Sequence, residues 1–270
     1  MLGATPAAAA HRSATTYRDR VAATTLTTVD GIRLAGYLHC VAAPRGSVVV
    51  AHGFTASATH ADVEALAGAL GTAGYDVVTY DARGHGDSEG QCTLGDLERH
   101  DVAAAVQATN PASGPVVLVG LSMGAIAVLR HAAEQSTAGV RPAVGVVTVS
   151  APARWKLPRN ARGVLSAGIT STPPGRAFAA RRLGVRLASG RRRPAPPIDL
   201  VTQLDVPLAI VHGIDDPFLP SSNARALYDA ASEPRRLDLV PGAWHAHDDA
   251  ALPVITAAVD WVTATVTRRD

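Results

Sequence analysis

One serine of the chain lies between two glycines, at the point where a predicted strand gives way to a predicted helix. Residues 120–124 are Gly-Leu-Ser-Met-Gly, with Ser122 at the centre. The apolar run before them predicts a buried strand, and Ala125–Ala138 predicts a helix. Such a turn raises the hydroxyl above the sheet, and the glycines let strand and helix pass closely. Ser122 is therefore a candidate nucleophile, with an ordinary serine in a tight turn as the alternative.

A serine hydroxyl is a poor nucleophile at neutral pH and needs a base beside it. Four other stretches combine the residue types that could supply a base, an acid or a close backbone approach. They are His52-Gly53-Phe54, Asp81–Ser88, His212–Asp216 and Pro241–His245.

These stretches fall between predicted strands and helices that alternate along the chain. Residues 21–30 and 32–41 alternate polar and apolar side chains around Asp30-Gly31 and predict an antiparallel hairpin. Ser47–Ala51 is a valine-rich run, which is typical of a strand buried on both faces. Further strands are predicted at 75–80, 116–120, 143–150, 206–212 and 235–240, and helices at 60–73, 94–108, 125–138, 221–231 and 249–267. The alternation predicts a mostly parallel sheet with right-handed crossovers.

The composition fits one α/β domain with an insertion. The chain has 270 residues, of which 47% are hydrophobic, enough for one sizeable core. No apolar run approaches the length of about twenty residues that a membrane span needs, and no secretory signal is evident. Cys40 and Cys92 lie in different segments and predict no disulfide framework, so a cytoplasmic location is expected. Residues 1–22 are expected to form a flexible tail.

One segment breaks the alternation. Residues 151–198 are rich in proline and contain ten arginines and one lysine, but no aspartate or glutamate. The segment is predicted to form a small basic cap over the carboxyl ends of the strands, where open α/β sheets bind their ligands.

The five chemically suggestive stretches occur in the order and at the spacing of the α/β-hydrolase superfamily. From about residue 24 to 267 the chain resembles its small-capped serine hydrolases, of the monoglyceride-lipase and serine-aminopeptidase-like type. The resemblance implies an α/β-hydrolase fold: a mostly parallel central sheet flanked by helices, formed by residues 23–150 and 199–270, with residues 151–198 inserted as the cap.

The resemblance also implies a Ser-acid-His triad in that order along the chain. It places the histidine after the last strand, which gives His245 as the base, with His247 as the alternative. It gives Asp216 as the acid, with Asp215 as the alternative. The acid would orient the imidazole and stabilise the imidazolium that forms during the reaction.

Two backbone N–H groups are expected to form the oxyanion hole of this family. They are those of Met123, directly after the nucleophile, and Phe54, in the loop after Ser47–Ala51. His52 is interpreted as a hydrogen-bonded loop residue rather than as a base.

The stretch Asp81–Ser88 allows a metal-binding or phosphate-binding interpretation. The preferred interpretation is structural, with Arg83 and Asp87 holding the turn by local hydrogen bonds and His85 without a ligand role. The cap arginines, among them Arg191, Arg192 and Arg193, are either a solvated surface or recognise anionic groups of a substrate. A membrane surface or nucleic acid is a third possibility, but aromatic residues make up only 4% of the chain and base stacking is poorly supported.

The sequence therefore predicts a serine hydrolase that cleaves carboxylic esters or thioesters of small-molecule acyl substrates, anionic ones included, through an acyl-serine intermediate. It predicts an esterase, lipase-like or thioesterase activity with no cofactor, no metal, no nucleic-acid partner and no integral membrane association. The same triad could serve an acyltransferase, a C–C hydrolase or a cofactor-free peroxidase. A ligand-binding module without turnover is the alternative from another class.

Overall fold

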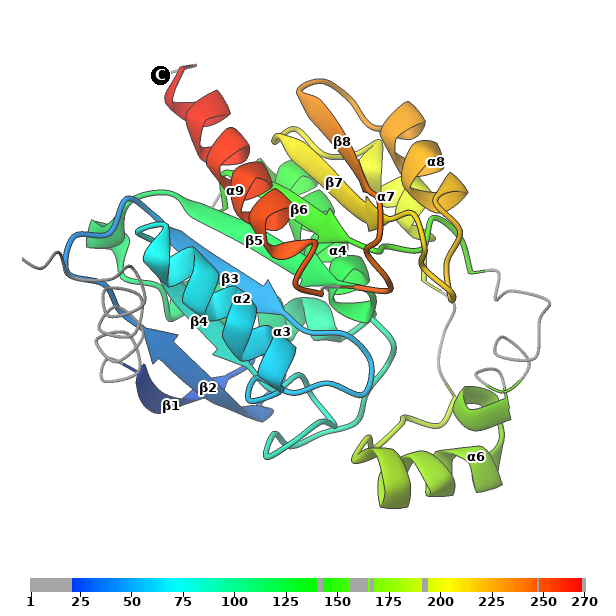
Figure 1. Ribbon diagram of the computed structural model, residues 1–270. Helices are drawn as coiled ribbons and strands as arrows, with labels where there is room; N and C mark the ends of the chain where they lie inside the picture. The colour runs from blue at the N-terminus through cyan, green and yellow to red at the C-terminus, as the bar shows by residue number, and fades with distance from the viewer. Residues whose placement is uncertain are drawn as a thin grey trace, which may run out of the picture.

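The computed structural model describes residues 21–139, 143–155, 165, 168–190, 194–246 and 248–268. Its centre is an eight-stranded sheet in the order β1-β2-β4-β3-β5-β6-β7-β8 (Figure 1). The strands are β1 (Val21–Thr27), β2 (Arg33–His39), β3 (Ser47–Ala51), β4 (Asp76–Tyr80), β5 (Val116–Leu121), β6 (Gly145–Val149), β7 (Leu208–Gly213) and β8 (Arg235–Val240). The hairpin β1-β2 and the pair β2-β4 are antiparallel, and every pair from β4 to β8 is parallel. The predicted mostly parallel sheet is confirmed.

Helices cover both faces of the sheet, so the central strands are buried on both sides. One face packs against α2 (Ala61–Thr72) and α9 (Leu252–Thr267). The other packs against α3 (Glu98–Gln107), α4 (Met123–Ala138), α7 (Pro197–Val201) and α8 (Ser222–Ala230). Every residue of β3, β5, β6 and β7 is buried, which explains why these strands are continuous apolar runs.

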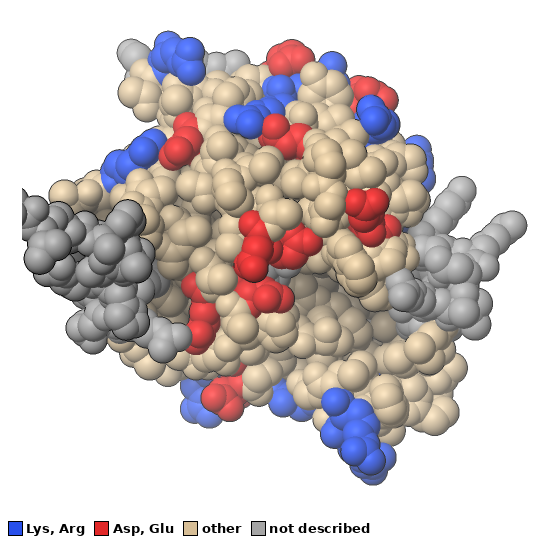
Figure 2. All heavy atoms as spheres, viewed as in Figure 1, with Lys and Arg blue, Asp and Glu red and all other residues tan. Residues whose placement is uncertain are grey.

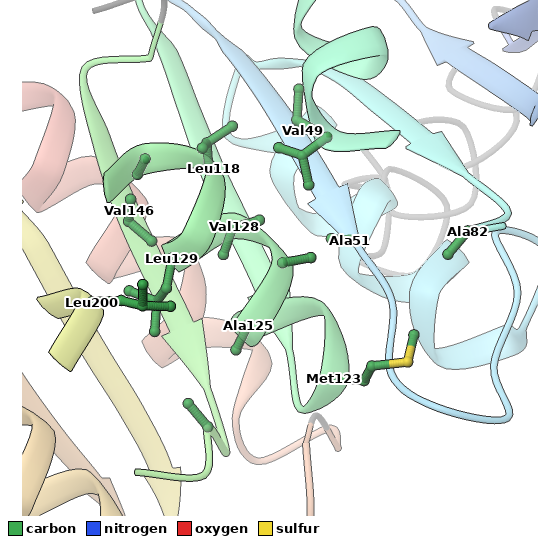
Figure 3. Close-up of a cluster of buried hydrophobic side chains, with 14 of the residues drawn as sticks. Val49, Ala51, Ala82, Leu118, Met123, Ala125, Val128, Leu129, Val146 and Leu200 are labelled. Atoms are coloured by element: carbon green, nitrogen blue, oxygen red, sulfur yellow. The ribbon is translucent and has the colours of Figure 1, made fainter. Parts of the chain in front are cut away.

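The packing around α4 fixes the helix that follows Ser122. Val128 and Leu129 of α4 pack in one cluster with Leu118 of β5 and Val146 of β6 (Figure 3). Leu200 of α7 joins the same cluster, so the chain returns to the core before β7 begins.

Among the helix boundaries, the start of α3 differs most from its prediction. The helix predicted at 94–108 begins at Glu98, because the backbone turns at Leu94 and Gly95, whose φ angles are +60° and +93°. The Glu98 carboxylate accepts hydrogen bonds from the backbone N–H of Thr93 and of Gly95. These side-chain bonds stabilise a turn where periodicity alone extends the helix.

Between β6 and α7 the chain leaves the sheet. The helix α6 (Pro173–Phe178) and the π-helical turn η2 (Ala179–Leu183) lie beyond the edge at which the parallel strands end (Figure 1). Backbone bonds tie the segment to the loop after β4: Arg186 N–H donates to Gly84 O at 2.8 Å and Cys92 N–H to Arg186 O at 2.7 Å. No helix in the described part of the chain has the length and apolar character to cross a bilayer.

Candidate active site

Ser122 lies in the tight turn between β5 and α4. Its φ angle is +52°, a left-handed conformation that a non-glycine residue adopts only where its surroundings enforce it. A Cβ on Gly120 would come within 2.5 Å of Ala125 Cα, and one on Gly124 within 2.1 Å of Ala51 O. Strand β5, helix α4 and the end of β3 thus approach so closely that only glycine fits on either side of the serine.

The structure brings Ser122, His245 and Asp216 into one hydrogen-bonded chain. His245 Nε2 lies 2.8 Å from Ser122 Oγ, and His245 Nδ1 lies 2.7 Å from Asp216 Oδ2. An ionised carboxylate can only accept, so Nδ1 carries the proton and Nε2 presents its lone pair to the serine hydroxyl. The Asp216 side chain is fully buried and the His245 side chain is 23% exposed.

The carboxylate of Asp216 has three hydrogen-bond donors. Its Oδ1 accepts the backbone N–H of Phe218 at 2.8 Å and of Leu219 at 2.9 Å, while Oδ2 accepts from His245. Burial alone would raise the pKa of Asp216, but these bonds outweigh it and the pKa is lowered from its usual value. Asp216 is therefore ionised at neutral pH, as the tautomer of His245 requires.

The alternative acid lies elsewhere in the same loop. Asp215 Oδ2 accepts the backbone N–H of Gly242 at 2.9 Å and holds the backbone of the loop that carries His245. The alternative base, His247, lies outside the described residues. The geometry thus favours Asp216 over Asp215 as the partner of the imidazole.

The loop after β3 passes directly beside the nucleophile. A Cβ on Gly53 would meet Ser122 Cβ at 3.5 Å, and Phe54 is the next residue. His52 fixes this loop, because its Nδ1 donates to Gly53 O at 2.8 Å and its Nε2 accepts Ala82 N–H at 2.9 Å. Burial lowers the pKa of His52 to about 4, which keeps the ring neutral. The roles of Phe54 and Met123 as oxyanion donors remain predictions.

Met123 is the first residue of α4. The first N–H groups of a helix have no acceptor within the helix, and they point toward its positive end. Such an N–H beside Ser122 is suited to an oxygen that becomes negative as the serine attacks.

The loop after β4 is held by its own charged residues. Arg83 donates through Nε to Asp101 Oδ1 at 2.8 Å and through its terminal nitrogens to both oxygens of Asp30. Burial alone would lower the pKa of Arg83, but these two ion pairs raise it. Asp87 takes part in a local hydrogen bond through its backbone N–H, which donates to Asp81 Oδ2 at 3.0 Å. The carboxylate that holds the loop is that of Asp81, whose Oδ1 also accepts the backbone N–H of Ala58 at 2.7 Å. Asp87 itself is exposed, and a Cβ on Gly86 would come within 2.0 Å of Asp81 Oδ2, so only glycine fits there.

No group of histidine, cysteine, aspartate and glutamate in the described part of the chain is arranged to hold a metal ion. The predicted substrate-binding residues Arg191, Arg192 and Arg193 lie outside the described residues. Two other arginines of the inserted segment, Arg181 and Arg182, are exposed. Figure 2 shows basic side chains along the upper and lower edges of the molecule and acidic ones near the centre of the face in view.

Comparison with known proteins identifies the family. The family model described as "Serine aminopeptidase, S33" matches residues 42–189, more than half of the chain. The chain belongs to this family. No curated protein matches it. The predicted α/β-hydrolase resemblance is thereby confirmed.

Solved structures share the fold of this serine-aminopeptidase-like chain. The chain is similar to the esterase Pf2001 of Pyrococcus furiosus, with 20% identity over 92% of each chain and a TM-score of 0.67. It is similar to the esterase domain of a Rhodothermus marinus protein, with 24% identity over 90% of this chain and 98% of that one, and a TM-score of 0.65. It is also similar to Est1E of Butyrivibrio proteoclasticus, determined with ferulic acid bound, with 20% identity over 90% and 99% and a TM-score of 0.65. The protein thus has the α/β-hydrolase fold of these structures.

Proposed function

We propose that this protein hydrolyses carboxylic esters and thioesters through an acyl intermediate on Ser122, with His245 as base and Asp216 as its orienting acid. The observation that carries the proposal is the hydrogen-bonded chain from Asp216 through His245 to Ser122 Oγ, with both contacts below 3 Å. It lies at the carboxyl edge of the sheet, where this fold presents its reacting groups.

Acylation begins when His245 Nε2 takes the Ser122 proton and Oγ attacks the carbonyl carbon. The carbonyl oxygen becomes negative, and the N–H groups of Phe54 and Met123 donate to it. The tetrahedral intermediate collapses when the imidazolium returns the proton to the leaving alcohol or thiol. Throughout, the Asp216 carboxylate stabilises the positive imidazolium but does not take its proton.

Deacylation repeats these steps with water. His245 Nε2 takes a proton from a water molecule, whose oxygen attacks the acyl carbon. The second intermediate expels Ser122 Oγ, which recovers its proton from His245, and the free acid leaves. Water is the second substrate, and His245 and Ser122 carry the proton and the acyl group in every step.

We propose that residues 151–198 form a cap over this site. Its arginines, Arg191, Arg192 and Arg193 among them, would raise the local potential and favour substrates that bear a carboxylate or phosphate. Support comes from the charge bias of the segment and from the position of α6 and η2 beyond the carboxyl edge of the sheet.

The first experiment uses a fluorophosphonate probe, which reacts with an activated serine. We expect stoichiometric labelling at Ser122 and none in Ser122→Ala. A folded wild-type protein that resists the probe would contradict the proposal and favour a binding module.

The second experiment asks which bond is cleaved, an ester or a thioester, and whether the acyl group passes to water or to an alcohol. p-Nitrophenyl esters of increasing acyl length are compared with acyl-CoA thioesters, and the released acid is measured with and without an added alcohol. Free acid as the main product indicates hydrolysis. Predominant transfer to the alcohol would instead make the protein an acyltransferase.

A further inference from the structure

Strained backbone is concentrated around the proposed catalytic residues. Among the described residues, positive φ angles at non-glycine positions occur at Thr55, Leu94, Ser122, Ser150 and Ala246. Thr55 follows Phe54, and Ala246 follows His245. Such residues cost about 1–3 kcal/mol each and persist where the surrounding structure requires them. Ser150 belongs to this group although the mechanism above gives it no role.

Ser150 joins the backbones of the nucleophile and the base. It follows β6 directly, is fully buried, and has a φ angle of +49°. Its Oγ accepts the backbone N–H of Ala246 at 2.9 Å. The preceding residue, Val149, accepts the backbone N–H of Ser122 through its carbonyl, also at 2.9 Å. Two consecutive residues at the end of β6 therefore hold the serine turn and the residue after His245.

Three side chains hold alternate amides of the histidine loop, residues 241–248 between β8 and α9. The N–H of Gly242 is bound by Asp215, that of Trp244 by Asp248, and that of Ala246 by Ser150. Asp215 lies in the acid loop and Asp248 in the histidine loop itself. Ser150 alone of the three lies at the end of a central strand, next to the serine turn.

We propose that Ser150 is a positioning residue for His245, an inference that rests on the proposed function. Its hydroxyl fixes Ala246 relative to β6 and so sets the separation of 2.8 Å between His245 Nε2 and Ser122 Oγ. The left-handed backbone at Ser150 accompanies the placement of the hydroxyl against the loop. A displacement of about 1 Å at a catalytic base can cost about 10²-fold in rate.

The test compares Ser150→Gly and Ser150→Ala with Ser113→Ala. Glycine accepts a φ of +49° without strain, so Ser150→Gly removes the hydroxyl and relaxes the backbone. Ser113 is also a buried serine, and its Oγ donates to Asp76 Oδ2 at 2.6 Å, at the amino edge of the sheet. Ser113→Ala therefore removes a comparable hydrogen bond far from the site. Activities are divided by the folded fraction, measured by thermal unfolding.

We expect both Ser150 variants to lose about 10- to 100-fold in kcat on alkyl esters. The loss should be smaller on p-nitrophenyl esters, because nitrophenolate leaves without a proton from His245. Ser113→Ala should keep the wild-type kcat on both substrates. A change in the folded fraction alone would not separate the two leaving groups.

Wild-type kcat in Ser150→Gly on both substrates would overturn the positioning role, and so would a kcat loss in Ser113→Ala as large as that in Ser150→Gly. Either result leaves the proposed function intact, because wild-type labelling and hydrolysis are measured in the same series. A wild-type protein without esterase activity would instead remove the proposed function and this inference together.

Discussion

The loop after β4 and the loops that carry Asp216 and His245 contain the same kinds of side chain in different arrangements. In the loop after β4, residues 81–92, the charges end on one another: the Arg83 side chain is 3% exposed and faces Asp101 and Asp30. In the other loops the polar chain runs through His245 to Ser122 Oγ, and the imidazole is partly exposed. One network is closed within the protein, and the other ends at the hydroxyl of the half-buried Ser122.

The difference comes from which groups hold the backbone. In the loop after β4, the Asp81 carboxylate accepts backbone amides, and Arg83 donates to a buried carboxylate, so these charged groups hold the backbone themselves. In the histidine loop, Asp215, Asp248 and Ser150 bind the amides, so the imidazole is available for proton transfer. A charged motif thus indicates chemistry only where other groups already hold its backbone.

The largest expected effect is the loss of activity when a side chain of the network that ends at Ser122 is removed. Ser122→Ala and His245→Ala should each lower kcat by at least about 10³-fold, because the residues of the proposed triad would act as a unit. Their unfolding temperatures should stay close to that of the wild type, since neither side chain is a main part of the core. Steady-state kinetics and calorimetry measure the two quantities. Near-wild-type turnover in either variant would assign the reaction to other residues.

The next effect distinguishes the two neighbouring aspartates. Asp216→Asn should lower kcat by about 10²- to 10³-fold, because an amide no longer holds Nδ1–H by charge. Asp215→Asn replaces the carboxylate that accepts the Gly242 N–H with an amide, and it should lower kcat by less than about tenfold. The reverse order of the two kcat values would make Asp215 the acid.

The closed network should affect stability instead of catalysis. Arg83→Met leaves Asp101 buried without its partner, and removing one member of a buried ion pair typically costs about 3–5 kcal/mol. The kcat of the folded fraction should stay within about threefold of wild type. Chemical denaturation measures the loss, with the exposed Asp87→Asn as a control of unchanged stability. A kcat loss beyond this range at full folding would give Arg83 a part in catalysis.

A smaller effect depends on pH. Burial lowers the pKa of His85 to about 4, whereas an unfolded histidine has a pKa of about 6.5. As the pH falls from about 6.5 to 4, the unfolded chain takes up a proton that the folded protein does not. The free energy of unfolding should therefore fall by about 1.4 kcal/mol per pH unit for this residue, with no contribution above about pH 6.5.

Denaturation at pH 7 and pH 5 tests this dependence. The free energy of unfolding should differ less between pH 7 and pH 5 in His85→Gln than in the wild type. The reduction should equal the contribution of one titrating histidine. Val49→Ala, which removes buried methyl groups that do not titrate, should lower stability equally at both pH values. If the unfolding free energy of His85→Gln differed between pH 7 and pH 5 as much as that of the wild type, His85 would be charged at pH 5 in the folded protein too.

The elements of the fold could be predicted because their patterns are local. Ser47–Ala51 and 116–120 are apolar runs, and both became central strands of a parallel sheet. Ser122 was a candidate for the same reason, since the glycines beside it occur within five residues. Helix α3 was predicted four residues too early, because its start depends on the Glu98 carboxylate binding the amides of the preceding turn.

The interactions that support the site could not be predicted because they join distant segments. Asp215 and Asp216 are adjacent, and only the folded chain separates the carboxylate at the imidazole from the one at Gly242. Ser150 is 96 positions from Ala246, and the sequence pattern predicts it only as the last residue of a strand. The sequence pattern names Asp87 beside Arg83 in the turn but not the Asp81 carboxylate, because no local pattern indicates which carboxylate points inward.

The smallest expected effect concerns three arginines of the inserted segment, in contrast to the buried Arg83. If Arg191, Arg192 and Arg193 attract anionic substrates, replacing all three with glutamine should lower kcat/KM for a carboxylate-bearing ester by about three- to tenfold at about 10 mM salt. The kcat/KM for a small neutral ester should stay the same, because the triad is untouched. At about 500 mM salt the screening length is only a few ångströms, so the preference of the wild type for the anionic ester should largely disappear. Equal kcat/KM for both esters across this salt range would contradict the proposal and make the three arginines a solvated surface.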